Sequence, residues 1–208
     1  MPTIGVIVLA AGSSSRLGRP KQTLLYGGKT LLARAIETAL EVNCGPVVVV
    51  TGANRDIVEP VAAAYPVQIA FNADWIAGMN ISIRAGLDAL TAANETLSSV
   101  IVATCDQPFL SAELLRELIR VHEESGKPII ASDYAGTQGV PALFDASLFP
   151  ELRTLPDGAG AGRLIAAYGP ERTAVVLFPD GAADVDTPED FARLVLRNEP
   201  RPQEGVQE

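Results

Sequence analysis

The chain has few of the residues that zinc sites, disulfides and hydrolytic triads require. Its 208 residues include two cysteines and one histidine, which is too few for a four-ligand zinc site. A Ser-His-Asp triad would have to use His122, which lies beside two glutamates on an expected helix and is predicted to be a solvated surface residue. No apolar run approaches the ~20 residues that span a bilayer, and no basic leader precedes the first expected strand. We therefore expect a cytoplasmic protein whose Cys44 and Cys105 stay reduced.

Carboxylates are missing from the first part of the chain. Residues 1–36 contain no Asp or Glu, although the whole chain has 25 of these against 16 Lys and Arg. The cations of this stretch are Arg16, Arg19, Lys21, Lys29 and Arg34. A net charge of −9 argues against nucleic acid or an anionic membrane as a partner, because both need a large basic face. The local group of cations instead predicts a small polyanion as the ligand.

The most informative segment is residues 9–21, LAAGSSSRLGRPK, which directly follows an apolar run at residues 4–8. A strand that ends in small residues lets successive backbone N–H groups face an anion without obstruction. Arginine can pair with two phosphate oxygens at once, and lysine acts as a mobile point charge. The segment therefore predicts a phosphate-binding loop. Its predicted ligand contacts are Leu9, Ala10, Ala11, Gly12, Ser13, Ser14, Ser15, Arg16 and Lys21.

The spacing excludes two commoner nucleotide loops. A Walker A loop needs a glycine five residues before Gly28, and Thr23 stands there. A dinucleotide motif needs three glycines in register, but Gly12 and Gly18 are six apart without a third. We therefore interpret residues 27–30 as a turn followed by a helix cap.

Apolar segments of strand length alternate with segments of helical period, which is typical of an α/β sheet. The expected strands are residues 4–10, 47–50, 67–71, 100–103, 129–131 and 174–178, and the expected helices are residues 31–42, 57–64, 81–90, 112–123, 161–168 and 188–196. The pattern predicts one α/β domain over residues 1–197, with a Rossmann-like, mostly parallel sheet and helices on both faces. Residues 198–208 have no apolar period and are predicted to form a disordered tail.

Ligands of such sheets bind beyond the carboxyl ends of the strands. The segments expected to meet in one cleft there are residues 12–21, 72–82, 106–108 and those after 178. Ser111 and Thr187 precede expected helices and are predicted to cap them.

Three aspartates lie at positions suited to a metal ion. Asp106 ends an apolar strand, where a carboxylate either holds Mg²⁺ against phosphates or caps the turn that follows. Asp184 and Asp186 lie ahead of another expected helix. One of them either completes the metal site or stabilises the helix by interacting with its dipole.

Four motifs together resemble the nucleotidyltransferases of the molybdenum cofactor type. They are LAAGSSSRLGRPK at residues 9–21, NADWIAGM at 72–79, CDQP at 105–108 and VDTPED at 185–190. The resemblance runs from about residue 4 to 196 and implies a fold of the nucleotide-diphospho-sugar transferase type. The chain is most similar to the molybdenum cofactor cytidylyltransferases, which transfer CMP from CTP to the phosphate of molybdopterin and release pyrophosphate. Those enzymes serve hydroxylases of the xanthine dehydrogenase class.

The resemblance also implies roles for single residues. Mg²⁺, or Mn²⁺ in its place, would bind Asp106 and Asp186, and the residues expected to carry catalysis are Arg16, Lys21 and Asp106. We expect Trp75, Gly78 and Met79 to line the acceptor pocket, and Asn80 and Ser82 to contact the nucleotide.

The loop sequence favours CTP over GTP, because guanylyltransferases usually have glycine at the position of Ala11 and aspartate at the position of Pro20. The chain departs from the cytidylyltransferase pattern at Asn80-Ile81, at Val140 and at Asp157-Gly158. These departures leave other readings open: a sugar phosphate or polyol phosphate as acceptor, GTP as donor, or a non-catalytic factor that carries molybdenum cofactor to a hydroxylase.

Overall fold

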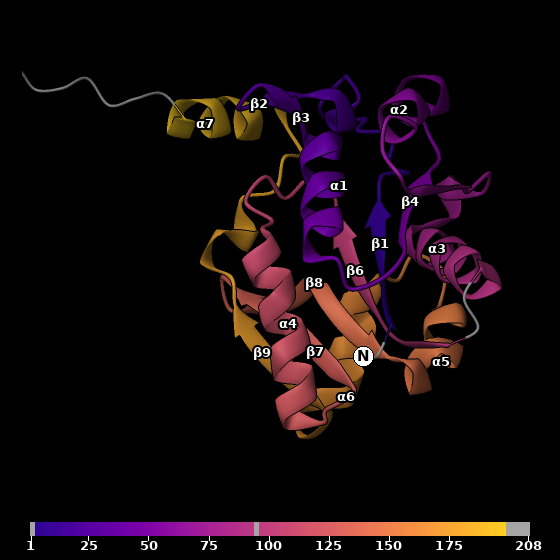
Figure 1. The fold of residues 1–208 in the computed structure, drawn as a ribbon. Coiled ribbons are helices and arrows are strands. Elements are labelled where there is room, and N and C mark those ends of the chain that lie inside the picture. The colour runs from indigo at the N-terminus through magenta and orange to yellow at the C-terminus, as the bar shows by residue number, and fades with distance from the viewer. Residues whose placement is uncertain (1–2, 94–95, 199–208) are drawn as a thin grey trace, which may run out of the picture.

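A computed structural model describes residues 3–93 and 96–198 (Figure 1). Within these residues a seven-stranded sheet has the order β5-β4-β1-β6-β8-β7-β9. The strands are β1 (Thr3–Leu9), β4 (Val47–Thr51), β5 (Gln68–Phe71), β6 (Leu97–Thr104), β7 (Ile129–Tyr134), β8 (Thr137–Asp145) and β9 (Thr173–Leu177), and a separate hairpin joins β2 (Leu25–Tyr26) to β3 (Lys29–Thr30). Every strand of the sheet except β8 runs in one direction, which confirms the predicted mostly parallel α/β fold.

The helices in the described residues are α1 (Leu31–Val42), α2 (Arg55–Ala62), α3 (Met79–Ala93), α4 (Ala112–Ser125), α5 (Phe149–Arg153), α6 (Ala161–Arg172) and α7 (Pro188–Asn198). Six of these helices were predicted from the sequence, and α5 was missed. Ser111 caps α4 by accepting from the N–H of Leu114, and Thr187 accepts from the N–H of Asp190 in α7. No helix within residues 3–93 and 96–198 has both the length and the apolarity that crossing a bilayer demands.

The predicted tail begins one residue too early. Asn198 belongs to α7, and the rest of the predicted tail, residues 199–208, lies outside the described part of the chain.

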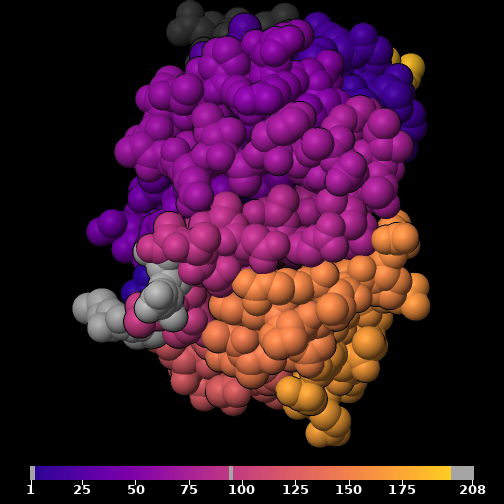
Figure 2. Space-filling model, turned by 90° about the vertical axis from the view of Figure 1, so that its right-hand side faces the viewer, coloured from indigo at the N-terminus to yellow at the C-terminus, as the bar shows by residue number. Residues whose placement is uncertain are grey.

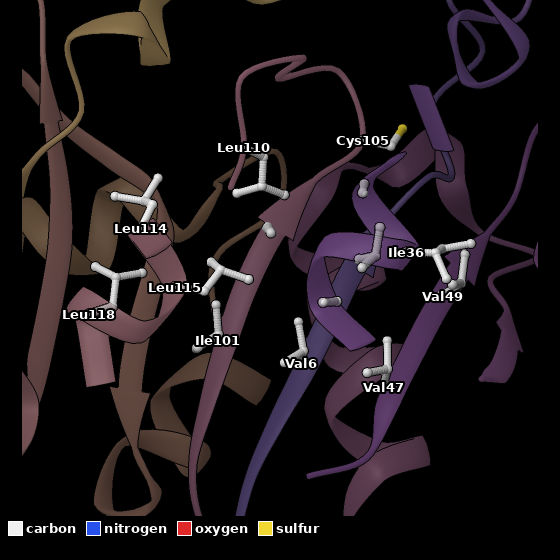
Figure 3. Packing of buried hydrophobic residues seen from close by; sticks show 14 of the residues in the cluster. Val6, Ile36, Val47, Val49, Ile101, Cys105, Leu110, Leu114, Leu115 and Leu118 are labelled. Atoms are coloured by element: carbon white, nitrogen blue, oxygen red, sulfur yellow. The ribbon is translucent and has the colours of Figure 1, made fainter. Parts of the chain in front are cut away.

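One face of the sheet packs against α1, α2 and α4 (Figures 1 and 3). Val6 of β1 and Ile101 of β6 point from the strands toward Ile36 of α1 and Leu115 of α4, and all four side chains are buried. Strands buried on both faces consist of nearly continuous apolar residues. This explains why the sequence shows apolar runs rather than alternation.

The opposite face packs against α3, α5 and α6. Ile7 of β1 and Val50 of β4 lie in this second cluster, next to Ile83 and Leu87 of α3. Figure 2 shows this side of the molecule, where the segment containing α3 lies directly beside the orange segment containing α5. Arg153 of α5 joins the two helices, with its Nε 2.8 Å from Oδ1 of Asp88.

Strand β8 was missed by the sequence analysis because Pro141 lies within it. Proline has no backbone N–H to donate a hydrogen bond to a neighbouring strand, so it normally argues against a central strand. In the structure, Ala142 pairs with Ala131 of β7 and Gly139 pairs with Ser132, so that Val140 and Pro141 bulge out between these pairs. The strand accommodates its proline at an irregularity where the ladder does not require an N–H.

His122 was wrongly predicted to be a solvated surface residue. Its side chain on α4 is 18% exposed. Nε2 lies 3.2 Å from the hydroxyl of Ser99 on β6, and Nδ1 lies 3.0 Å from the carbonyl of Lys127. The ring therefore links α4 to the sheet, at the end opposite to the expected cleft.

A third buried cluster fixes α7 against the start of the chain. Leu194 of α7 and Val185 pack with Leu17, Leu24 and Leu31. The C-terminal helix thereby supports the loop that follows β1, which explains how residues 170 positions apart in sequence share one site.

We predict that Gly86 is required for α3 to approach the sheet. A Cβ at this position would lie 2.7 Å from Cγ2 of Ile7 and 2.9 Å from Cγ2 of Val50. Gly86→Ala should therefore lower the free energy of unfolding by about 1–3 kcal/mol, as overpacking does. Gly162→Ala in α6 is the matched control, since its nearest atom would be 4.0 Å away. Urea titration should show that the control is neutral or slightly stabilised, and equal effects of the two variants would contradict the account.

Candidate active site

The segments predicted to converge do meet at the carboxyl ends of the parallel strands. A cavity of about 220 Å³ opens there between the loop after β1, the segment before α3 and the end of β6. It is lined by Leu9, Ala10, Ala11, Gly12, Lys21, Gln22, Trp75, Gly78, Met79, Ser82, Thr104, Cys105 and Asp106. A Cβ at Gly12 would meet no atom within 4 Å, so this glycine leaves open space on the cleft side of the loop.

A larger cavity of about 420 Å³ lies between α7 and η4 (Pro179–Ala182) and borders the site through Asp184. Its two arginines are already paired, Arg193 with Asp190 and Arg197 with Asp180. The smaller cavity contains the predicted loop and Asp106, so we assign the site to the smaller one.

The centre of the site is an ion cluster built on Lys21. Its Nζ lies 2.5 Å from Oδ2 of Asp106 and 2.9 Å from Oδ1 of Asp186. The other oxygen of Asp186 lies 2.5 Å from Nη2 of Arg16. The Lys21 and Asp106 side chains are 16% and 18% exposed, whereas the Arg16 side chain is 70% exposed. The three residues expected to carry catalysis therefore form one charged network with Asp186.

The network shifts the pKa values of its members. Burial disfavours the charged form of Lys21, but the charges and hydrogen bonds of Asp106 and Asp186 outweigh it and raise the pKa of Lys21. Burial likewise opposes ionisation of Asp186, yet Lys21 and Arg16 hold its pKa below the usual range. The pKa of Asp184 is raised, first by partial loss of hydration and then by the negative charges of Asp106 and Asp186. Asp184 thus differs from Asp186, whose carboxylate contacts both Lys21 and Arg16; the charge of Lys21 lowers the pKa of Asp184 too little to offset the effects that raise it.

Hydrogen bonds from the backbone and from a side-chain amide bring Asp106 close to residues 184–186. The N–H of Val185 donates to the carbonyl of Asp106 at 3.1 Å, which lays residues 184–186 beside the end of β6. The buried Gln107 donates from Nε2 to the carbonyls of Val140 and Gly181. These bonds hold the turn after β6 against β8 and η4, so the spacing between Asp106 and Asp186 is fixed by the scaffold.

Gln22 shapes the glycine-rich loop and was missed by the sequence analysis. Its side chain is fully buried, and its Nε2 donates to the carbonyls of Ala10 and Gly12 at 2.8 Å each. Ser14, in the left-handed region with φ 57°, accepts from the N–H of Lys21 at 3.0 Å. A glutamine directly after the predicted loop lysine was the available signal, but the sequence does not show that its amide turns back into the loop.

The residues predicted just before and at the start of α3 differ in how they face the cavity, since Gly78 and Ser82 line it and Asn80 does not. Asn80 is buried and donates to the carbonyl of Leu155, so it faces the segment around Asp157 rather than the cavity. Ser82 lines the cavity and accepts from Nδ2 of Asn72 at 2.9 Å. Gly78 has φ 131°, and a Cβ there would lie 2.9 Å from Cα of Gly158. Close packing therefore accounts for this glycine.

Of the remaining predicted residues, Trp75 and Met79 line the cavity wall, whereas Ser13, Ser14, Ser15 and Arg16 are not part of that lining. Arg19, Lys29 and Arg34 are not part of the lining either, and Arg19 lies over the ring of Phe191. Lys29 pairs with Glu37, and Arg34 donates to the carbonyl of Pro108.

The donor set suits a hard divalent cation that arrives with phosphates. Within residues 3–93 and 96–198, no three Asp, Glu, His or Cys side chains are arranged to hold a metal ion by themselves. Asp106 and Asp186 nevertheless direct one oxygen each to the same cation, Lys21 Nζ. Mg²⁺ is usually held by one or two carboxylates together with substrate phosphates, so the pair fits that ion.

The chain is similar to several known proteins over most of its length. The model of the MobA-like NTP transferase domain matches residues 6–173. Nicotine blue oxidoreductase of Paenarthrobacter nicotinovorans is 34% identical over 94% of this chain and 98% of its own. Purine catabolism protein PucB of Bacillus subtilis is 29% identical over 90% of this chain and 93% of its own. The crystal structure of Rv0371c from Mycobacterium tuberculosis H37Rv in complex with manganese has 25% identity and a TM-score of 0.75, covering 93% of this chain and 98% of that one.

We predict that Gln22→Leu destabilises the protein through the glycine-rich loop. The substitution leaves the carbonyls of Ala10 and Gly12 without their donor, at a cost of about 1–3 kcal/mol for each one that stays buried. Gln68→Leu is the matched control, because that exposed amide donates to a helix carbonyl at 3.3 Å and its loss should change stability by less than about 0.5 kcal/mol. Urea unfolding measures both. Equal stability of the two variants would show that Gln22 does not support the loop.

Proposed function

The chain belongs to the MobA-like NTP transferase domain family, and we propose that it transfers CMP from CTP to the phosphate of molybdopterin with release of pyrophosphate. The proposal assigns this activity to residues 1–197 and to the cytosol. The observation that carries it is the ion cluster of Lys21, Asp106 and Asp186 at the mouth of a cleft walled by the glycine-rich loop. Such a cluster supplies both signs of charge that a nucleotide with its metal ion requires.

In this reaction the glycine-rich loop and two cations hold the triphosphate. An oxygen of the acceptor phosphate attacks the α-phosphorus in line. A new P–O bond forms there while the bond from the α-phosphorus to the oxygen that bridges to the β-phosphate breaks, and pyrophosphate leaves with that electron pair. Lys21 and Arg16 stabilise the negative charge that grows on the leaving group.

The attacking group comes from the substrate, so the protein needs no nucleophile. Cys105, the thiol nearest the site, is unsuited to that role because burial raises its pKa to about 12. Asp106 and Asp186 would hold Mg²⁺ or Mn²⁺, which when bound reduces the negative charge that an attacking anion meets. The manganese complex of the Rv0371c protein supports a divalent ion in this fold.

The cleft favours a one-ring base. The side chain of Ala11 lies in its wall. The guanylyltransferase pattern has glycine at this position, which would leave room for a purine.

The acceptor assignment rests on the motif resemblance and on Trp75 and Met79 in the cavity wall. The relative that is named a purine catabolism protein agrees with a client hydroxylase of the xanthine dehydrogenase class. Sugar phosphates and polyol phosphates are the competing acceptors. Pyrophosphate released from CTP only in the presence of molybdopterin distinguishes them.

A second candidate function is oxidoreduction, which the name of the 34% identical relative favours. The chain lacks the three-glycine dinucleotide motif, and the ion cluster of Lys21, Asp106 and Asp186 suits phosphate and a metal ion better than hydride transfer. A change in nicotinamide absorbance with a dye substrate, without CTP consumption, would favour this candidate.

We predict that CTP stabilises the protein more than GTP does, in the presence of Mg²⁺ or Mn²⁺. A ligand at about 100 times its Kd adds ~2.7 kcal/mol, which raises the Tm of a protein of this size by roughly 5–10 °C. Thermal shift with CTP, UTP, ATP and GTP measures the order. An equal or larger shift with GTP would overturn the base assignment while leaving the nucleotidyltransferase assignment intact.

We predict that Asp186→Asn and Asp106→Asn each lower kcat by about 10²–10³-fold, the range for losing one group that stabilises transition-state charge. Asp184→Asn is the matched control and should retain much more activity, because Asp184 is exposed and makes no ion pair with Lys21 or Arg16 among the described contacts. Steady-state kinetics, with circular dichroism to verify folding, measures this. Near-wild-type turnover by Asp186→Asn would transfer the metal role to Asp184.

A further inference from the structure

Lys21 lies where two carboxylates already share a cation. Its Nζ contacts one oxygen of Asp106 at 2.5 Å and one of Asp186 at 2.9 Å. Arg16 covers the second oxygen of Asp186. The residues expected to hold a metal ion are therefore paired with the residues expected to hold phosphates.

A metal ion and Lys21 would therefore compete for the same carboxylate oxygens of Asp106 and Asp186. A divalent ion bound to the same two oxygens would lie against the ammonium group, and like charges repel strongly at such separations in a poorly solvated site. Lys21 would have to withdraw, and its side chain is only 16% exposed, so withdrawal without a new partner leaves a charge poorly compensated. A polyphosphate provides that partner.

We propose that Lys21, assisted by Arg16, is a resident counter-ion that keeps the Asp106–Asp186 pair closed to divalent cations until a nucleoside triphosphate draws the two cations away. Metal and nucleotide then bind as one unit, and either alone binds weakly. This inference rests on the proposed function, because it assumes that the cleft takes the nucleotide. It goes beyond that function by stating that the metal ion and the nucleotide each promote the binding of the other.

The linkage has an unusual consequence for substitution. Removing a positive charge from most phosphate sites weakens every ligand, but here it should release the carboxylates for metal. Lys21→Met should therefore bind Mn²⁺ more tightly than the wild type in the absence of nucleotide, and bind CTP more weakly. A coupling of the usual size between two sites predicts about a tenfold gain in Mn²⁺ affinity.

The test is titration of Mn²⁺ into nucleotide-free protein, followed by electron paramagnetic resonance of the free ion. The matched control is Lys29→Met, which removes the same charge from an exposed lysine that pairs with Glu37 outside the site. We expect the control to stay within about twofold of the wild type. A gain for Lys21→Met no larger than that for Lys29→Met would overturn the proposal.

Two further variants keep the test decisive. The double variant Lys21→Met with Asp186→Asn should lose the gain, because the released carboxylate is gone. If Lys21→Met does not fold by circular dichroism, Lys21→Gln takes its place, since an uncharged amide can still donate to both carboxylates. Lys21→Gln should also bind Mn²⁺ more tightly than the control, and its failure to do so would be equally contradictory.

The same titrations separate this proposal from the proposed function. If Lys21→Met gains Mn²⁺ affinity but CTP never binds the wild type, the counter-ion role holds and the nucleotide assignment fails. If CTP and Mn²⁺ bind the wild type together but Lys21→Met shows no gain, the counter-ion role fails alone.

Discussion

The ammonium of Lys21 between two carboxylates is the interaction on which the candidate site depends. Asp106 ends β6 and Asp186 precedes α7, so one lysine on the loop after β1 ties the first, middle and last parts of the chain together. The pair would be costly to bury without it, since an uncompensated carboxylate in a poorly solvated place costs several kcal/mol. At the rim of the site, Arg16 pairs with the second oxygen of Asp186, and the exposed Asp184 adds a further negative charge.

Hydrogen bonds between uncharged groups hold the segments that carry Lys21, Asp106 and Asp186. Gln22 draws the carbonyls of the loop inward, and Gln107 holds the turn after β6. Packing of Leu194 and Val185 on the loop holds α7 in place. Hydrogen bonds from side-chain amides and apolar packing thus hold the backbone segments that carry the charged residues. The charged side chains themselves can therefore exchange partners when a ligand binds.

The sequence was sufficient for the fold and for which segments meet at the carboxyl ends of the strands, because apolar runs, glycine-rich turns and helix caps are local signals. It failed where structure depends on distant contacts. Strand β8 was hidden by Pro141, which only the bulge against β7 accommodates. The direction of the Asn80 side chain could not be predicted either, because its amide donates to the carbonyl of Leu155, 75 residues away. Gln22 was missed for the same reason, since nothing in its neighbours shows that its side chain turns into the core.

The central claim is that Asp106 and Asp186 exchange Lys21 for a metal ion when a nucleotide enters the cleft. A crystal structure with Mn²⁺ and a non-hydrolysable CTP analogue tests it most directly. We expect the base to lie against Ala11 and Ser82, the metal to bind Asp106 and Asp186, and Nζ of Lys21 to contact phosphate oxygens. A structure in which the analogue is bound in the cleft while Lys21 still bridges the two carboxylates would contradict the claim.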